Sequence, residues 1–153
     1  MLARRIRLPD RGTGRSLQQL PVGRDPMALT TIVAMLALLE FIAFALMVGR
    51  ARGAYGVDAP ATSGHPEFDK RYRVQMNTQE QLVVFLPALF AFGWFVGDVW
   101  AAGLGVVFVF GRALYARQYV ADPASRGPGM MLSFLPNLVL VLGSIVGAAL
   151  TLF

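Results

Sequence analysis

The sequence predicts an all-α membrane protein, built as an up-and-down bundle of four transmembrane helices. Hydrophobic residues make up 56% of the 153 residues and charged residues only 15%, whereas soluble domains carry about 25% charged residues. The hydrophobic residues also come in long blocks separated by short polar loops, as expected of segments that cross the hydrocarbon of a bilayer. Short loops make successive helices antiparallel, and the length allows one domain.

The four helices are expected at about residues 27–49, 68–96, 99–120 and 130–153 of a membrane domain covering 27–153. The first has Glu40 as its only charge and is long enough to cross about 30 Å of hydrocarbon. The second and third each join an apolar stretch to a polar stretch, and the fourth has no charge.

Residues 1–26 are basic and rich in turn-forming residues, so we expect a disordered tail. No cleavage site of small residues follows the first apolar block, which predicts a retained helix and not a signal peptide. With four crossings, both termini and the turn at Gly97 and Asp98 share one side of the membrane, and the other two loops share the opposite side. Arginines lie at both ends, which leaves the orientation in an inner or plasma membrane open.

Composition also narrows the chemistry. There is no cysteine, and His65 is the only histidine, so no metal site is expected. Most basic residues are arginines that flank or enter apolar segments, which favours membrane lipid headgroups or an anionic small ligand over nucleic acid as partner.

Polar side chains follow one face of the second helix and one face of the third, at spacings of three and four residues. Groups of this kind at membrane depth need partners or a water-filled site. Arginine binds carboxylates in a bidentate way, a glutamate can hold an ammonium, and amide side chains can pair with amides, so the pattern favours a site for a small, mainly anionic zwitterion. The alternative is a structural network in which Arg73 pairs with Glu80 or Glu40 and the tyrosines anchor the interface. The residues are Arg73, Asn77 and Glu80, then Arg112, Tyr115 and Tyr119, with Arg50, Arg52 and Arg126 at the same end.

The stretch GHPEFDKRYRVQMNTQE, with RALYARQY further on, resembles the MAPEG family of membrane-associated proteins in eicosanoid and glutathione metabolism. The family signature E-F-x-R-x-x-R-x-Q-x-N-x-x-E is matched on the second helix, with Lys70 at its first arginine position. This resemblance covers about residues 27–153. It implies a homotrimer that binds glutathione between neighbouring protomers.

The resemblance further implies a bacterial-type microsomal glutathione transferase or peroxidase that attacks a lipophilic electrophile or a lipid hydroperoxide, with glutathione as cosubstrate. Arg126 falls at the position of the family's thiol-activating arginine. An arginine suits that role because an adjacent guanidinium favours the thiolate form of a thiol. Two departures stand out: Gln81 replaces a tyrosine of several members, and Gly53 replaces a second arginine of the leukotriene-forming members. The positions implied to contact glutathione are Arg52, Arg73, Gln75, Asn77, Glu80, Arg112, Tyr115 and Tyr119.

Other readings stay open at this point. Some family members bind a lipid or a partner protein without catalysis, and a small structural or transport membrane protein would also carry headgroup-binding arginines. Glu40 is expected to hydrogen-bond another helix, with Asn137 as the candidate partner. The pair Gly143 and Gly147 would allow close helix packing, either between protomers or within one.

Overall fold

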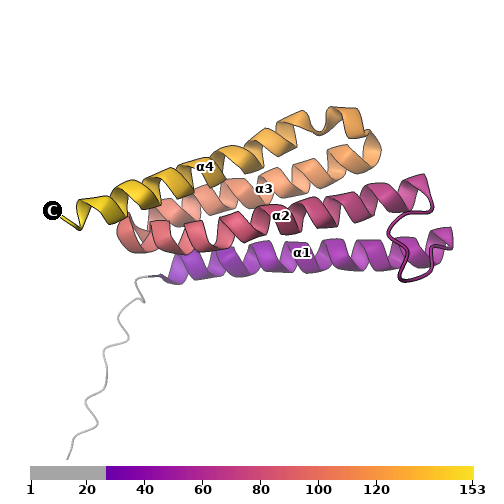
Figure 1. Ribbon diagram of the computed structural model, residues 1–153, viewed down its shortest axis with the longest axis horizontal. Coiled ribbons are helices and arrows are strands. Elements are labelled where there is room, and N and C mark those ends of the chain that lie inside the picture. Colours follow the sequence, from indigo (N-terminus) through magenta and orange to yellow (C-terminus); the bar gives the residue numbers. More distant parts are fainter. Residues whose placement is uncertain (1–26) are drawn as a thin grey trace, which may run out of the picture.

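The computed structural model describes residues 27–153, all helical apart from turns and loops; the expected tail lies outside these residues. Four long helices run up and down, as Figure 1 shows, so that the start of α1, the α2–α3 turn and the C-terminus lie at one end. The predicted up-and-down order of the helices is therefore confirmed, and the sides of the membrane on which their ends lie stay a prediction. The elements are α1 (Ala28–Tyr55), α2 (Pro66–Phe95), α3 (Asp98–Ala121), the short 3₁₀ helix η1 (Pro123–Arg126) and α4 (Gly127–Leu150).

Three of these helices, α1, α3 and the η1–α4 segment, are long and apolar enough to cross a membrane. The fourth, α2, is the longest helix of the described chain, but its first half consists mostly of polar residues, which lowers its mean hydropathy. The expectation of four helices is confirmed; a membrane crossing by α2 stays a prediction.

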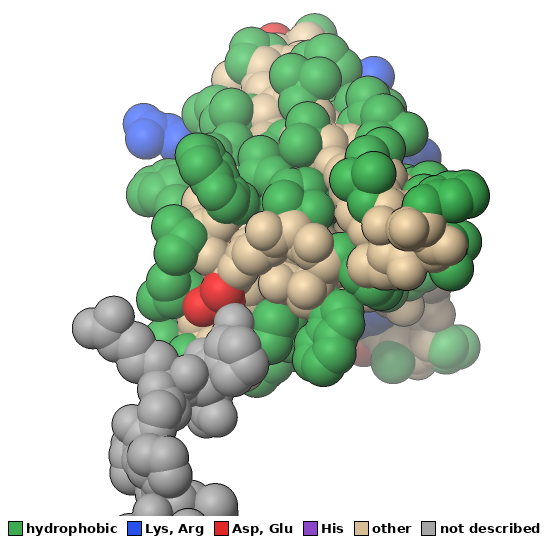
Figure 2. All heavy atoms as spheres, turned by 90° about the vertical axis from the view of Figure 1, so that its left-hand side faces the viewer, with side chains coloured by type: hydrophobic (Ala, Val, Ile, Leu, Met, Phe, Trp, Pro, Cys, Tyr) green, Lys and Arg blue, Asp and Glu red, His purple; other side chains and the backbone are tan. Residues whose placement is uncertain are grey.

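The outer surface of the bundle is apolar. Leu39 is 60% exposed, Ile145 61% and Trp94 73%, exposures that a water-soluble protein avoids in contiguous patches but a lipid-facing surface requires. Figure 2 shows hydrophobic side chains gathered over the end where α1 begins and α4 finishes.

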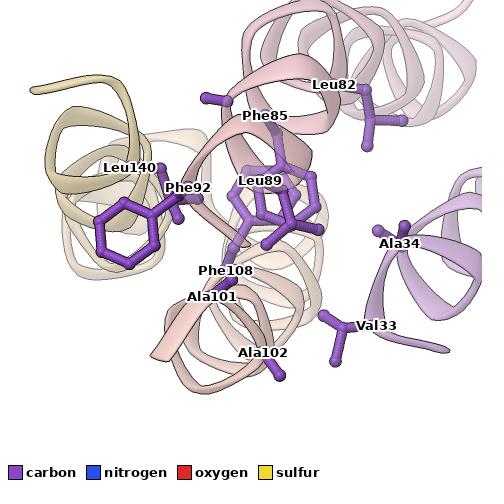
Figure 3. Close-up of a cluster of buried hydrophobic side chains, with 12 residues drawn as sticks. Val33, Ala34, Leu82, Phe85, Leu89, Phe92, Ala101, Ala102, Phe108 and Leu140 are labelled. Carbon is purple, nitrogen blue, oxygen red and sulfur yellow. The ribbon is translucent and has the colours of Figure 1, made fainter. Parts of the chain in front are cut away.

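The apolar core joins all four helices, and α2 contributes more of its side chains than any other helix (Figure 3). Phe85 of α2 stacks on Phe108 of α3, with ring centroids 3.8 Å apart. Leu89 and Leu140 are completely buried beside them. This core fixes the register of α2 against α3, and the polar halves of both helices continue from it toward the loop end.

The helix ends differ from the expected limits for local reasons. α1 continues through Gly49 and Gly53 to Tyr55 and ends at Gly56, which adopts the left-handed conformation with φ 64°. At its other end, the carboxylate of Asp98 accepts hydrogen bonds from the backbone N–H groups of Leu29 (3.1 Å) and Thr30 (2.7 Å). The first residue of α3 thus caps α1.

Two close helix contacts depend on glycine. A Cβ atom on Gly129 would lie 2.6 Å from the Cα of Tyr115, so α4 begins in direct backbone contact with α3. A Cβ on Gly147 would lie 2.9 Å from the Cβ of Phe95, and one on Gly143 would collide with Phe92. The Gly143–Gly147 pair therefore packs α4 on α2 within the protomer, one of the two arrangements expected.

Candidate functional site

A buried arginine is at the centre of the polar end of the bundle. Arg112 of α3 is only 1% exposed. Its Nη2 donates to the hydroxyl of Thr78 at 2.7 Å, and its Nη1 donates to Oδ1 of Asn77 at 3.1 Å. Its guanidinium also lies over the ring of Tyr115, 4.3 Å from the centroid. No carboxylate of residues 27–153 lies within ion-pair distance of Arg112, and its buried Nε has no partner there.

Helical spacing explains why these groups meet. Asn77 and Thr78 lie about two helical turns before Phe85 on α2, on the face toward α3. On α3, Arg112 lies one turn and Tyr115 two turns after Phe108. The Thr78 hydroxyl also donates to the backbone carbonyl of Val74 at 2.7 Å, which leaves its oxygen oriented as an acceptor for the guanidinium.

The cluster extends outward in two directions. On α2, Nδ2 of Asn77 donates to Oε2 of Glu80 at 3.1 Å. On α3, Tyr115 packs on Tyr119 with centroids 5.4 Å apart, and the exposed guanidinium of Arg126 lies 6.0 Å from the Tyr119 ring. We call Asn77, Thr78, Glu80, Arg112, Tyr115, Tyr119 and Arg126 the Arg112 cluster.

Arg126 is held by the turn that contains it. Its Nη1 donates to the backbone carbonyl of Pro123 at 2.7 Å, while Oε1 of Gln118 accepts from the N–H of Gly129 at 3.0 Å. The first bond lies within η1 and the second joins the start of α4 to the last turn of α3, while Oγ of Ser125 ties η1 to α3 by donating to the carbonyl of Gln118 at 3.3 Å. The remaining donors of the Arg126 guanidinium have no hydrogen bond within the described chain and face outward.

Three of the expected contact residues form no hydrogen bond with this cluster. Arg73 is exposed and Gln75 half-buried, and no hydrogen bond within residues 27–153 joins either to the cluster. Gln75 and Asn77 are two residues apart on one helix, which turns their side chains about 200° away from each other.

Arg52 has a different role within the protomer. Its Nη1 donates to the carbonyls of Ala61 (2.8 Å) and Val57 (3.3 Å), and its guanidinium lies 4.8 Å from the centroid of Phe68. Arg52 therefore ties the end of α1 to the α1–α2 loop. Sequence spacing did not predict this, because the carbonyls that it binds belong to an irregular loop.

The ion pairs of the described chain lie at the start of α2. Glu67 contacts Lys70 and Arg71, each at 2.8 Å. Hydrogen bonds from Lys70 and then Arg71 lower the pKa of the Glu67 carboxyl to about 2.

The structural alternative in which Arg73 pairs with Glu80 or Glu40 is not observed. The expected bond between Glu40 and Asn137 is also absent; Asn137 donates instead to Oε1 of Gln81 at 3.0 Å, because α2 and not α1 is the neighbour of α4 at that level.

No group of three or more potential metal-binding His, Cys, Asp or Glu side chains occurs in the part of the chain that the structure describes. His65 caps α2, its Nδ1 accepting from the N–H of Glu67 at 3.2 Å, and it stacks on Tyr55. Both ring contacts are structural.

The whole chain was compared with known protein families and with individual known proteins. The sequence pattern of the MAPEG family matches residues 28–146, which include α1, α2, α3 and most of α4. The chain belongs to the MAPEG family. An uncharacterized protein of Synechocystis is 40% identical over 115 residues, covering 75% of this chain and 84% of that protein. Members of the family are membrane proteins, and so is this chain.

Two named relatives bear on activity. Human microsomal glutathione S-transferase 2 is 38% identical over 105 residues, 69% of this chain and 71% of the relative. Bovine leukotriene C4 synthase is 37% identical over 103 residues, 67% of this chain and 69% of the relative. At the level of the family, these similarities support a glutathione-dependent transferase.

Proposed function

We propose that this protein is a membrane-bound glutathione transferase that conjugates glutathione to lipophilic electrophiles. The observation that carries the proposal is the buried charge of Arg112, which forms no ion pair within residues 27–153. A guanidinium this deeply enclosed among apolar helices is stabilised when an anion pairs with it, and its hydrogen bonds to Thr78 and Asn77 hold it ready for one.

Glutathione fits this arrangement chemically. It carries two carboxylates, one ammonium and two peptide groups, so its net charge is negative. Arg112, Arg126 and Arg73 supply the positive charge, Glu80 can accept the ammonium, and Asn77 can pair with a peptide group. The tyrosine rings supply a flat, partly polar wall beside them.

The site is proposed to form between protomers of a homotrimer. Gln75 and Arg52 point away from the Arg112 cluster of their own protomer, so one bound molecule that contacts all of these positions needs a second copy of the chain. Gln75 and Asn77 face opposite sides of α2, which supports this arrangement. Each copy would present Gln75 to one neighbour and Asn77 to the other.

Arg126 is proposed to activate the thiol. A free thiol has a pKa of about 8.5 and is mostly protonated at neutral pH, and a neighbouring guanidinium stabilises the thiolate. Arg126 is exposed and held by one backbone hydrogen bond, which leaves the rest of its guanidinium available to a ligand. A bound thiolate then attacks the electrophile, which enters from the bilayer.

The test is to mix the purified protein with glutathione, record the ultraviolet thiolate band, and follow conjugation of chlorodinitrobenzene. We expect a thiolate band and turnover in the wild type, and loss of the band in Arg126→Ala. Arg117→Ala is the matched control, because Arg117 is an exposed arginine of α3 without a hydrogen bond in the described chain. Glutathione binding without a thiolate band would support a non-catalytic lipid- or partner-binding member, and absence of binding would refute the proposal.

A further inference from the structure

A pocket lies on α1, at the level where the apolar stretch of this helix ends. It holds about 310 Å³ and is lined by one face of α1 together with Arg71 of α2. The lining residues of α1 follow one another at helical spacing, and the alanines among them leave the hollow between the larger side chains. They are Ala43, Met47, Arg50, Ala51, Ala54 and Tyr55.

The pocket changes from apolar to cationic along α1. Residues 41–49 carry no charge, and Met47 packs against the apolar cluster between α2 and α3. Arg50 follows within one turn, and the lining extends about 18 Å from Ala43 to Tyr55 at 1.5 Å per residue. An apolar half followed by a cationic half matches an amphiphile at the boundary between hydrocarbon and headgroups.

Arg71 is fixed in place by contacts from both helices. Its Nη1 donates to Oε2 of Glu67 at 2.8 Å, and its guanidinium lies 5.7 Å from the ring centroid of Tyr55. Tyr55 is itself stacked on His65, with centroids 4.4 Å apart. Nε and Nη2 of Arg71 form no hydrogen bond within residues 27–153, so they can donate to a ligand.

The positive charge around the pocket exceeds what its neighbours neutralise. Glu67 is shared between Lys70 and Arg71, each at 2.8 Å, so one carboxylate faces two cations. Arg50 is exposed and forms no ion pair in the described chain. An anion between Arg50 and Arg71 would balance this excess, and the oxygens of a phosphate can accept several guanidinium N–H groups at once.

The pocket is separate from the proposed glutathione site. Arg50 and Arg52 are two residues apart on α1, which turns their side chains about 200° from each other. Arg52 lies against Phe68 and the α1–α2 loop, whereas Arg50 lines the pocket. No member of the Arg112 cluster lines it.

We propose that this pocket binds an anionic phospholipid, with the phosphate between Arg50 and Arg71 and the start of one acyl chain along Ala43 and Met47. The rest of the chain would lie on the apolar outer surface of the bundle. Inorganic phosphate has the same charge chemistry, but it would leave the apolar half of the pocket without a partner. A zwitterionic lipid such as phosphatidylcholine would bring a quaternary ammonium beside two guanidinium groups, so the lipid is expected to carry net negative charge.

The test measures lipid binding to the purified full-length protein in detergent by native mass spectrometry. The probes are dioleoylphosphatidylglycerol and dioleoylphosphatidylcholine, and we expect tighter binding of phosphatidylglycerol. One basic residue contributes about fivefold to binding at an anionic membrane surface, so Arg50→Gln should lower the affinity for phosphatidylglycerol about fivefold, and Arg50→Gln/Arg71→Gln should lower it further. Arg117→Gln is the matched control, because Arg117 is an exposed arginine outside the pocket, and it should bind as the wild type does.

A further variant keeps both arginines. Ala54 is exposed, so Ala54→Phe places a ring in the hollow without disturbing the core. It should weaken phosphatidylglycerol binding while leaving the melting temperature in lipid-free detergent unchanged. Equal binding of the two lipids, or a loss in Arg117→Gln as large as that in Arg50→Gln, would overturn the inference. Displacement of phosphatidylglycerol by inorganic phosphate at constant ionic strength would also overturn it, because the site would then be one for free phosphate.

Discussion

Removal of the Thr78 hydroxyl should weaken glutathione binding without abolishing catalysis. In Thr78→Val the shape of the side chain is kept, but the acceptor of the 2.7 Å bond from Nη2 of Arg112 is lost. Because both residues are at most 1% exposed, water cannot replace that bond. A hydrogen bond to a charged group contributes about 1.5–3 kcal/mol.

This hydrogen bond positions the guanidinium for a carboxylate of glutathione, so its loss is expected to weaken glutathione binding. At about 1.4 kcal/mol per tenfold, the loss corresponds to an increase in the glutathione KM of about 10-fold to 100-fold. Since a carboxylate far from the reacting sulfur is bound equally in the ground and transition states, kcat should stay nearly constant. Steady-state kinetics with varied glutathione measures both.

Thr78→Ser provides the control, because it keeps the hydroxyl and loses only a methyl group. We expect its KM to return close to the wild-type value. If Thr78→Val binds glutathione as tightly as the wild type, or if Thr78→Ser is as impaired as Thr78→Val, the hydroxyl does not position Arg112 and the reasoning is wrong.

Two predictions concern stability and one concerns the helix cap. Gly129→Ala should lower the free energy of unfolding by about 1–3 kcal/mol, the usual cost of overpacking, because its Cβ would meet the backbone of Tyr115; Gly127→Ala, with nothing within 4 Å, is the control, and equal melting temperatures would contradict the close contact. The folded-state pKa of Glu67 is about 2, below its usual 4.5, so its ion pairs stabilise the fold above about pH 4.5 and lose this effect as the pH falls toward 2. The melting-temperature difference between wild type and Glu67→Gln should therefore be largest near neutral pH and shrink on acidification, and a difference that grows in acid would exclude these pairs as its origin. Asp98→Ala should lower the melting temperature and speed hydrogen exchange at Leu29 and Thr30, whose N–H groups lose their acceptor; unchanged exchange there would show that the cap is unimportant.

The sequence predicted the helices well because long apolar blocks admit few other structures in a membrane protein. Helical periodicity predicted that Arg112 and Asn77 lie at the same end of the bundle, and it predicted that Tyr115 and Tyr119 lie on the same face of α3 as Arg112. Thr78 was missed, because a threonine inside a helix carries no pattern that separates a buried acceptor from a packing residue.

Contacts between helices and loops were harder to predict than which side chains share one face of a helix. The role of Arg52 depends on carbonyls in an irregular loop, and the partner of Asn137 depends on which helix lies beside α4. Gln75 and Asn77 were grouped by their match to one motif, although the helix turns them to opposite sides.

The most direct test of the central claim is a calorimetric titration of glutathione into the purified protein in detergent, compared with the same titration into Thr78→Val. We expect saturable binding to the wild type and binding that is at least about tenfold weaker in the variant. Absence of saturable binding to a folded wild-type protein would contradict the assignment of the Arg112 cluster as a glutathione site.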